Sequence, residues 1–277
     1  MFSELVQRLV QKAIDNNPAP EKIYKGEDGL LHCGICGEPF QQRVEPNAIF
    51  RDGTAPRDCK CMREIHRKAD EERERRKAEE RIAELQRMGF SDPAYMRMTF
   101  ENDKGYSPAA RSAAEWYVDN FPELRKSGKG LMFMGSTGTG KTFFACCIAN
   151  ALIKKGVPVW VTTMRPLLRK LGDFNTAEAV INQIKSFELL ILDDFGTNQA
   201  TARNLELLFD VVDTRIRTGK PLIITTNLAP DDFKDAPIEL QRIYSRIKQM
   251  CLNCEKSPVI MSGADRREEI VRQAHGE

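Results

Sequence analysis

From about Met98 onward, short apolar runs alternate with amphipathic stretches along the chain. The apolar runs predict five strands, at residues 130–134, 157–162, 189–192, 221–226 and 257–261. The amphipathic stretches predict helices near residues 141–155, 164–171, 176–186, 200–218 and 238–250. Strands and helices that alternate at this spacing are typical of a parallel, doubly wound sheet. We therefore expect an α/β fold in this part of the chain.

The first 61 residues follow a different pattern. Residues 1–17 place seven apolar residues at helical spacing, in one stripe: Phe2, Leu5, Val6, Leu9, Val10, Ala13 and Ile14. Pro18 and Pro20 end this predicted helix. Such a stripe needs a partner, and the sequence leaves two open. One is the loop-rich, cysteine-bearing segment at 30–61 of the same chain, and the other is a different protein.

Residues 62–87 are mostly charged, with nine Lys or Arg and eight Asp or Glu. Glu71 precedes Arg75 by four residues, which is the favourable order for an ion pair along a helix. We expect a solvated helix that acts as a spacer. The predicted organisation is an N-terminal helix with a cysteine-bearing module at 1–61, a charged helical linker at 62–97 and the α/β domain at 98–277.

Charge and hydropathy narrow the class of protein. The 277 residues carry 42 Lys or Arg against 40 Asp or Glu, and this balance excludes a histone-like polybasic binder. No run approaches the ~18 apolar residues of a spanning helix, and the N-terminus lacks a signal-peptide core. We therefore expect a soluble, cytoplasmic protein.

The charge is nevertheless segregated within the α/β domain. Residues 124–172 hold nine basic residues and no acidic one, whereas residues 173–213 hold eight acids and two bases. Within the basic stretch, Arg165, Arg169 and Lys170 are candidates for a DNA-facing surface. The alternative is a solvated helix face.

The strongest motif is G-x-x-x-x-G-K-T, which follows a predicted strand and opens a helix, as a P-loop requires. Its glycines let backbone N–H groups converge on a polyphosphate, and the helix N-terminus adds partial positive charge. We expect Lys141 to pair with the β- and γ-phosphates of ATP and Thr142 to offer its hydroxyl to Mg²⁺. The candidate phosphate-binding residues are Gly135, Ser136, Thr137, Gly138, Thr139, Gly140, Lys141 and Thr142.

Two further predicted strands end in polar residues that suit the binding and hydrolysis of ATP. Asp193 and Asp194 follow the buried strand at 189–192. We expect Asp193 to hold Mg²⁺ through water and Asp194 to orient or activate the attacking water, as in a Walker B motif. Asn227 follows the fourth strand and is a candidate sensor of the γ-phosphate, the alternative being a simple turn or helix cap.

In this order, the segments GSTGTGKT, LLILDD, IITTN and LQRIYSRI resemble the AAA+ ATPases of the DnaC/DnaI helicase-loader and IstB transposition-helper group. The segment YMRMTFEN is similar to the one that leads into the family's ATPase core. The resemblance covers roughly residues 90–270 and implies a P-loop AAA+ core with a parallel five-stranded sheet. It also implies that an arginine, Arg246 or next Arg242, reaches the ATP site of a neighbouring subunit and neutralises phosphate charge.

Two features depart from many members of that group. Asp194 stands where many AAA+ proteins have Glu, so we expect slow turnover. The chain ends soon after the fifth predicted strand, so we expect no C-terminal helical lid.

The cysteines predict a metal site. Cys33, Cys36, Cys59 and Cys61 form C-x₂-C and C-x-C pairs, and four thiolates satisfy tetrahedral Zn²⁺. Because C-x-C is less standard, His32 or His66 is an alternative ligand, and a redox pair is an alternative to zinc. Cys146 and Cys147 are most simply core thiols, while the role of Cys251 and Cys254 stays open.

The family resemblance implies a function. We expect an ATP-dependent loader of a hexameric replicative helicase onto single-stranded DNA, assembled as a ring or spiral, whose zinc-binding module at 1–61 binds the helicase. The alternatives are an IstB-like transposition helper and a nucleotide-switched adaptor with little hydrolysis.

Overall fold

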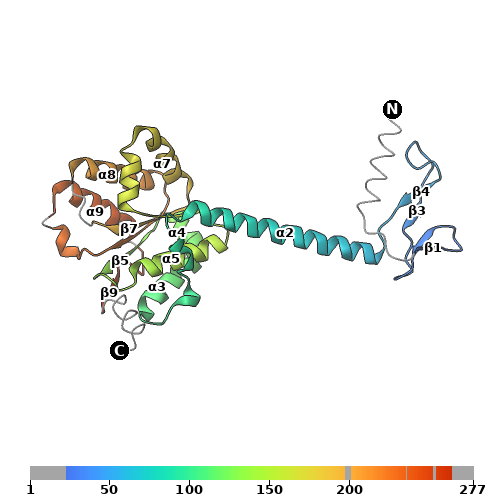
Figure 1. Ribbon diagram of the computed structural model, residues 1–277, viewed down its shortest axis with the longest axis horizontal. Helices are drawn as coiled ribbons and strands as arrows, with labels where there is room; N and C mark the ends of the chain where they lie inside the picture. Colours follow the sequence, from blue (N-terminus) through green and yellow to red (C-terminus); the bar gives the residue numbers. More distant parts are fainter. Residues whose placement is uncertain (1–22, 197–200, 235, 252–253, 264–277) are drawn as a thin grey trace. The chain divides into compact units, whose positions relative to one another are not determined.

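The computed structural model describes residues 23–196, 201–234, 236–251 and 254–263 (Figure 1). The chain divides into two compact units, Met1–Ala78 and Glu79–Glu277. The predicted apolar helix at 1–17 and any lid after residue 263 lie outside the described residues. Within the described ranges, the structure contains no helix that is both long and apolar enough to cross a membrane.

The first unit contains two short antiparallel hairpins followed by a long helix. β1 (Ile23–Lys25) pairs with β2 (Leu31–Cys33), and β3 (Gln41–Arg43) pairs with β4 (Thr54–Pro56). Each strand is only three residues long. Three residues are too few for a readable hydrophobic alternation, which is why the sequence predicted only loops here.

The charged helix is confirmed as α2 (Lys60–Gly89), and the boundary between the two units falls inside it. Its side chains pair along the helix surface, as Arg67 does with Glu71. α2 ends at Gly89, where a β-carbon would lie 2.3 Å from the carbonyl oxygen of Val159. Only glycine permits this close approach of helix and strand.

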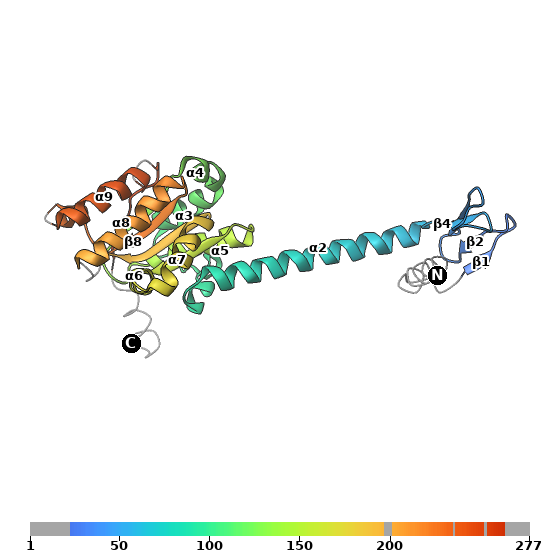
Figure 2. The ribbon, with the colours of Figure 1, turned by 90° about the horizontal axis from the view of Figure 1, so that it is seen from above.

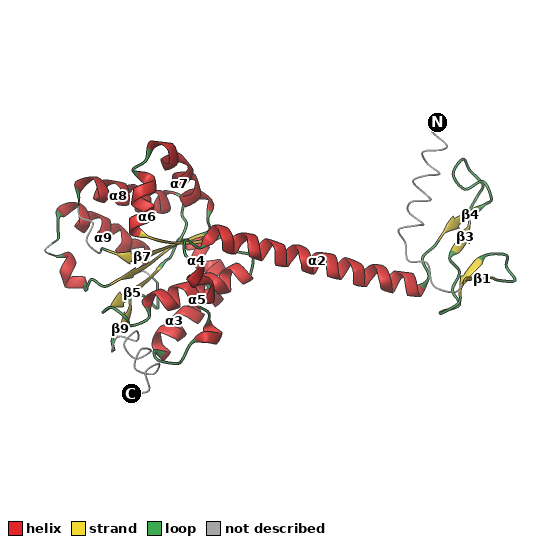
Figure 3. Cartoon of the chain, viewed as in Figure 1, coloured by secondary structure: helices red, strands yellow, loops and turns green. Residues whose placement is uncertain are grey.

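A five-stranded parallel sheet forms the centre of the second unit (Figure 3). Its strands are β5 (Leu131–Gly135), β6 (Val159–Thr163), β7 (Leu189–Phe195), β8 (Leu222–Thr226) and β9 (Val259–Met261). All five overlap the predicted runs, so the predicted parallel sheet is confirmed. The spatial order β6-β7-β8-β5-β9 places β8 between the P-loop strand β5 and the acidic strand β7. Three carboxyl strand ends therefore meet at one edge, where open α/β sheets bind ligands.

Helices cover both faces of this sheet (Figure 2). Alternate strand residues, such as Phe133 and Met132, join opposite clusters, and both clusters are apolar. One face carries α3 (Pro108–Asp119), α4 (Phe121–Ser127) and α5 (Lys141–Lys154). The other carries α6 (Met164–Leu171), α7 (Phe174–Ser186), α8 (Ala202–Arg217) and α9 (Ile238–Cys251). The five predicted helices are confirmed as α5 to α9, whereas α3 and α4 were not predicted.

α8 carries a buried arginine that the hydropathy pattern does not reveal. Arg215 is 0% exposed, and its guanidinium donates to the carbonyl oxygens of Ile184, Phe187, Glu188 and Pro221 at 2.6–3.1 Å. Burial lowers the pKa of Arg215 to about 10, so the group remains charged at neutral pH. This one side chain joins the end of α7 to the segments that lead into β7 and β8.

Candidate nucleotide site and cysteine cluster

The P-loop connects β5 to α5 and takes a conformation that requires glycine. Gly138 and Gly140 have φ values of 78° and 94°, in the left-handed region that most residues avoid. Lys141 Nζ donates to the Ser136 carbonyl oxygen at 2.7 Å, and Thr139 Oγ1 donates to the same oxygen at 2.9 Å. The loop therefore curves over the N-terminus of α5, where backbone N–H groups suit a polyphosphate.

Asp193 at the end of β7 is bonded to the first turn of α5. It is 3% exposed, and its Oδ1 accepts hydrogen bonds from Thr142 Oγ1 at 2.8 Å and from Thr225 Oγ1 at 2.5 Å. Burial raises the pKa of Asp193, while these two donors act in the opposite direction. A hydroxyl and a carboxylate held together at a phosphate loop are hard oxygen ligands, and this donor set fits Mg²⁺.

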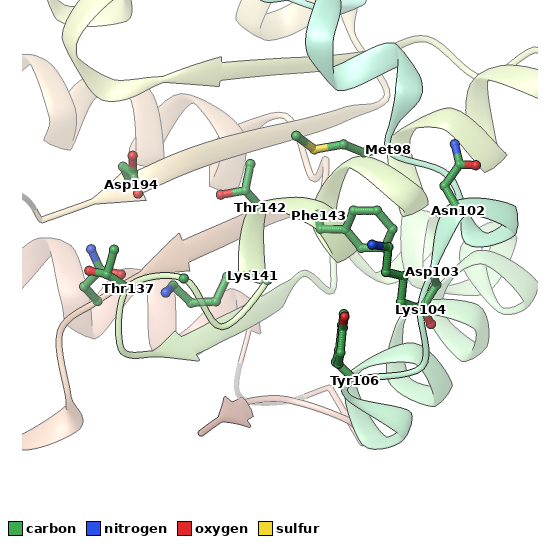
Figure 4. A pocket seen from close by; sticks show the side chains of 13 residues that line it. Met98, Asn102, Asp103, Lys104, Tyr106, Thr137, Lys141, Thr142, Phe143 and Asp194 are labelled. Carbon is green, nitrogen blue, oxygen red and sulfur yellow. The ribbon is translucent and has the colours of Figure 1, made fainter. Parts of the chain in front are cut away.

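A pocket of about 440 Å³ opens beside the P-loop (Figure 4). Asp194 and Asn227 line it together with Lys141 and Thr142. The structure thus brings the predicted Walker B acid and the predicted sensor to the cavity that faces the P-loop. Asp193 lies behind this wall, bonded to Thr142.

The residues at the opposite end of the pocket belong to none of the predicted nucleotide-binding motifs. That end is lined by the segment before α3 and by one residue of α5: Met98, Asn102, Asp103, Lys104, Tyr106 and Phe143. Arg111 fixes this segment by donating to Asp103 Oδ2 at 3.1 Å and to the Phe100 carbonyl oxygen at 3.0 Å. In the sequence, this end of the pocket is marked by the segment YMRMTFEN, which is similar to the family's lead-in segment. That similarity did not predict a role for any side chain of the segment.

The same segment also reaches the acidic strand. Tyr95 in the short 3₁₀ helix η1 (Pro93–Arg97) points its hydroxyl at Asp193 Oδ2, 3.4 Å away. Asn150 of α5 is buried and donates to the carbonyl oxygens of Tyr95 and Met98 at 2.8 and 2.9 Å. Burial raises the pKa of Tyr95, so its hydroxyl stays protonated as a donor. The lead-in segment is therefore fixed to the P-loop helix.

The candidate arginines of α9 do not line this pocket. Arg246 Nη1 lies 2.9 Å from Asp213 Oδ1, and its guanidinium carbon is 4.7 Å from the centre of the Phe209 ring. Arg242 is exposed on the same helix. Neither arginine is among the residues that line the pocket of its own chain, so a role in hydrolysis would require a second copy of the chain.

The four predicted cysteine ligands come together in the first unit. The sulfur atoms of Cys33, Cys36, Cys59 and Cys61 all lie within 4.8 Å of one another. The backbone N–H of Glu38 lowers the pKa of Cys36 to about 6, which favours the thiolate. Four converging thiols are soft ligands, and this donor set fits Zn²⁺.

The two candidate histidine ligands have other partners. His32 Nδ1 lies 2.9 Å from the Gly37 carbonyl oxygen, and its Nε2 lies 2.9 Å from Asp28 Oδ2. His66 Nδ1 lies 3.4 Å from a carboxylate oxygen of Asp58. Neither histidine belongs to the four-cysteine cluster, and His32 instead braces the turn between the first two cysteines.

The remaining cysteines are buried in the second unit. Cys146 and Cys147 lie in α5, in line with the prediction of core thiols. Cys251 ends α9 and donates its S–H to the Leu222 carbonyl oxygen, while Cys254 is also buried. Among the described residues they form no second metal-binding group.

Among the described residues, four of the nine basic residues in the predicted basic stretch form ion pairs with acids outside that stretch. Arg125 pairs with Glu188, and Lys154 pairs with Glu101. The three candidate DNA-binding residues differ, because within the described part of the chain no ion pair involves them: Arg165, Arg169 and Lys170. They are exposed on α6, and the nearby Phe174 is 96% exposed.

The family of IstB-like ATP-binding proteins matches residues 71–237, more than half of the chain. The chain belongs to this family. The predicted DnaC/IstB-like AAA+ ATPase class is thereby confirmed.

Relatives of this IstB-like chain include two kinds of protein. The replicative helicase loader DnaI of Bacillus subtilis is 24% identical, over 94% of this chain and 85% of that protein. An ATP-binding protein in an insertion sequence of Mycobacterium tuberculosis is 30% identical over 110 residues, which are 39% of this chain and 44% of that protein. The crystal structure of DnaI is 27% identical with a TM-score of 0.54, and the match covers 64% of this chain and 95% of that one.

Proposed function

We propose that this protein is an ATP-dependent loader that places a replicative DNA helicase onto single-stranded DNA during replication initiation. The observation that carries the proposal is the extent of the match with the loader DnaI. The second unit is less than three quarters of the chain, so a match over 94% extends into the cysteine-bearing unit. The IstB family match, in contrast, begins at residue 71. Relatedness in both units favours loading over transposition.

ATP hydrolysis takes place, in this proposal, at the edge of the sheet. The P-loop amides and Lys141 hold the β- and γ-phosphates, and Asp194 orients the attacking water opposite Asn227. Bound Mg²⁺ would add positive charge between the phosphates, held by Thr142 directly and by Asp193 through water. Because Asp194 is one methylene shorter than the common glutamate, turnover is expected to be slow.

The far end of the pocket suits the nucleobase. Met98 and Phe143 offer apolar surface for a flat aromatic ring, and Asn102 offers a polar group at its edge. In this proposal the phosphates of ATP lie at the P-loop and its base lies at the far end of the pocket.

The partners are assigned to three surfaces. The cysteine-bearing unit, with its bound zinc, contacts the helicase. Arg246 of a second copy, with Arg242 as the next candidate, reaches the γ-phosphate, so the active form is a ring or spiral. Single-stranded DNA lies along α6 and the start of α7, where Arg169 and Lys170 contact phosphates and the exposed ring of Phe174 stacks on a base.

A pull-down against the host's replicative helicase tests this proposal. The full chain is immobilised, and helicase capture is compared in ATP, in ADP and without nucleotide. We expect capture in ATP and release when ATP is replaced by ADP. Absence of capture in all three conditions would refute the loader function.

Two other functions have an observation in their favour. The relative in an insertion sequence favours a transposition helper, which predicts binding to duplex target DNA and none to the helicase. Asp194 in place of glutamate favours an adaptor that binds ATP with little hydrolysis. An ATPase rate that single-stranded DNA does not change, and that Asp194→Asn does not lower, would support the adaptor.

A further inference from the structure

The two aspartates at the end of β7 lie in a β-bulge. β7 pairs regularly with β8 as far as Leu192, and pairing resumes at Phe195 after the register has slipped by one residue. Asp193 and Asp194 therefore stand opposite a single residue of β8, Thr225. A bulge redirects side chains and takes one residue out of the backbone ladder, so its bonds must be supplied in another way.

The Thr225 side chain supplies them. Thr225 is 0% exposed, and its Oγ1 accepts the backbone N–H of Asp194 at 3.0 Å. The same hydroxyl donates its proton to Asp193 Oδ1 at 2.5 Å. A hydroxyl has one proton and two lone pairs, so it makes both bonds at once. One buried side chain thus contacts both members of the acidic pair.

The backbone of Asp194 needs such support. Its φ is 56°, the only left-handed value at a non-glycine position among the described residues. Aspartate adopts this conformation more readily than most L-residues, but it remains uncommon, so contacts that hold the backbone favour it. From this conformation Asp194 lines the pocket beside the P-loop, so its place in the site depends on the bulge.

We propose that Thr225 is a positioning residue for the nucleotide site, whose hydroxyl aims the Asp193 carboxylate at Thr142 and locks Asp194 in its pocket-facing backbone conformation. The inference rests on the proposed ATPase function. It adds a residue that lies outside the P-loop, the acidic pair and the sensor. Loss of the hydroxyl leaves the Asp194 N–H without its acceptor and removes one charge-assisted bond from Asp193.

Three variants test the proposal. Thr225→Val keeps the branched shape and removes the hydroxyl, whereas Thr225→Ser keeps the hydroxyl. Thr226→Val is the matched control, because Thr226 is equally buried and its hydroxyl also makes two hydrogen bonds, with the backbone of Phe195 and Leu228. Thr226→Val therefore removes two hydrogen bonds, as Thr225→Val does, but neither of them involves Asp193 or Asp194.

Two measurements are made on each variant: ATPase kinetics, and ATP binding titrated with MgCl₂ or in EDTA. In Thr225→Val we expect kcat to fall about 10- to 100-fold. The Mg²⁺ concentration for half-maximal tightening of ATP binding should rise several-fold. The KM for ATP and the affinity in EDTA should stay nearly constant, because the P-loop is intact. Thr225→Ser should restore both values, and Thr226→Val should leave them near wild type.

Equal losses in Thr225→Val and Thr226→Val, or no recovery in Thr225→Ser, would overturn the proposal. A wild-type chain without ATPase activity would refute the proposed function, while the Mg²⁺ dependence of ATP binding would still decide the role of Thr225. If Thr225→Val does not fold, Thr225→Ala removes the same hydroxyl with less bulk, and the same expectations apply.

Discussion

The two units of the chain are stabilised in different ways. In the second unit, two apolar clusters on opposite faces of the sheet bury residues of the strands and of the helices that cover them. In the first unit, the buried cluster among the described residues consists of Cys33, Cys59 and Met62. Two of these three are candidate metal ligands. We therefore expect the first unit to depend on a metal bound by its cysteines, whereas the second unit depends on hydrophobic burial.

Because of this difference, we expect the two units to be destabilised by different changes. Loss of the cysteine ligands should destabilise the first unit, and disruption of the apolar core should destabilise the second.

The largest effect is expected from removal of zinc. Structural zinc contributes on the order of 10–16 kcal/mol to small modules, so a chelator should unfold the hairpins around Cys33 and Cys59. Hydrogen exchange should show loss of amide protection at residues 23–56 and retained protection in the sheet. ATP affinity should not change. Joint loss of protection in both units would show that they are not stabilised independently.

The second unit folds through its own core, but its active site is expected to need a neighbour. Arg246→Ala should lower kcat about 1,000-fold without changing ATP affinity, since an arginine supplied in trans acts on the transition state. Mixing Arg246→Ala with inactive Lys141→Ala should restore part of the activity, because each chain supplies what the other lacks. No recovery on mixing would place Arg246 outside the site.

The core of the second unit contains a buried charged side chain, Arg215, and replacing it tests the stability of that core. Arg215→Met should reduce the free energy of unfolding by about 3–5 kcal/mol, because four buried carbonyl oxygens lose their donor. Arg217→Met on the same helix is the control. The Arg217 side chain is 80% exposed, so its pair with Asp213 should contribute less than about 1 kcal/mol. Urea unfolding of the second unit measures both.

The smallest effect concerns the surface of the second unit. Reversing charge at Arg169 and Lys170 should weaken single-stranded DNA binding about 10-fold and reduce its salt dependence. Lys126→Glu combined with Lys155→Glu is the charge-matched control, because Lys126 already pairs with Glu123 and Lys155 with Asp119. Unchanged DNA affinity and salt dependence in the variant of Arg169 and Lys170 would leave α6 as a solvated helix face.

The second unit was the easier part to predict from sequence. Strands buried on both faces give continuous apolar runs, such as that of β7, and motifs mark where these runs end. α3 and α4 were not predicted, because they contain no recognised motif and do not lie between two predicted strands. In the first unit, the spacing of the cysteines predicted a metal site. Its strands could not be predicted, because three residues are too few to show a hydrophobic alternation.

Part of the site depends on contacts that no local pattern encodes. Thr225 contacts the acidic pair only because β8 lies beside β7 and the register slips at the bulge. Tyr95 reaches Asp193 only because Asn150 fixes the lead-in segment to α5. Strand order and bulges are tertiary features, so the segments YMRMTFEN and IITTN could be recognised in the sequence but the contacts of Tyr95 and Thr225 with the acidic pair could not.

The most direct test of the account compares helicase capture with ATP binding in the same full-length variant. Cys33→Ser combined with Cys36→Ser removes half of the proposed zinc ligands and leaves the second unit unaltered. We predict that this variant no longer captures the replicative helicase while its affinity for ATP stays within about twofold of wild type, a difference below ~0.4 kcal/mol. Helicase capture that survives the loss of both cysteines would contradict the division of roles proposed for the two units.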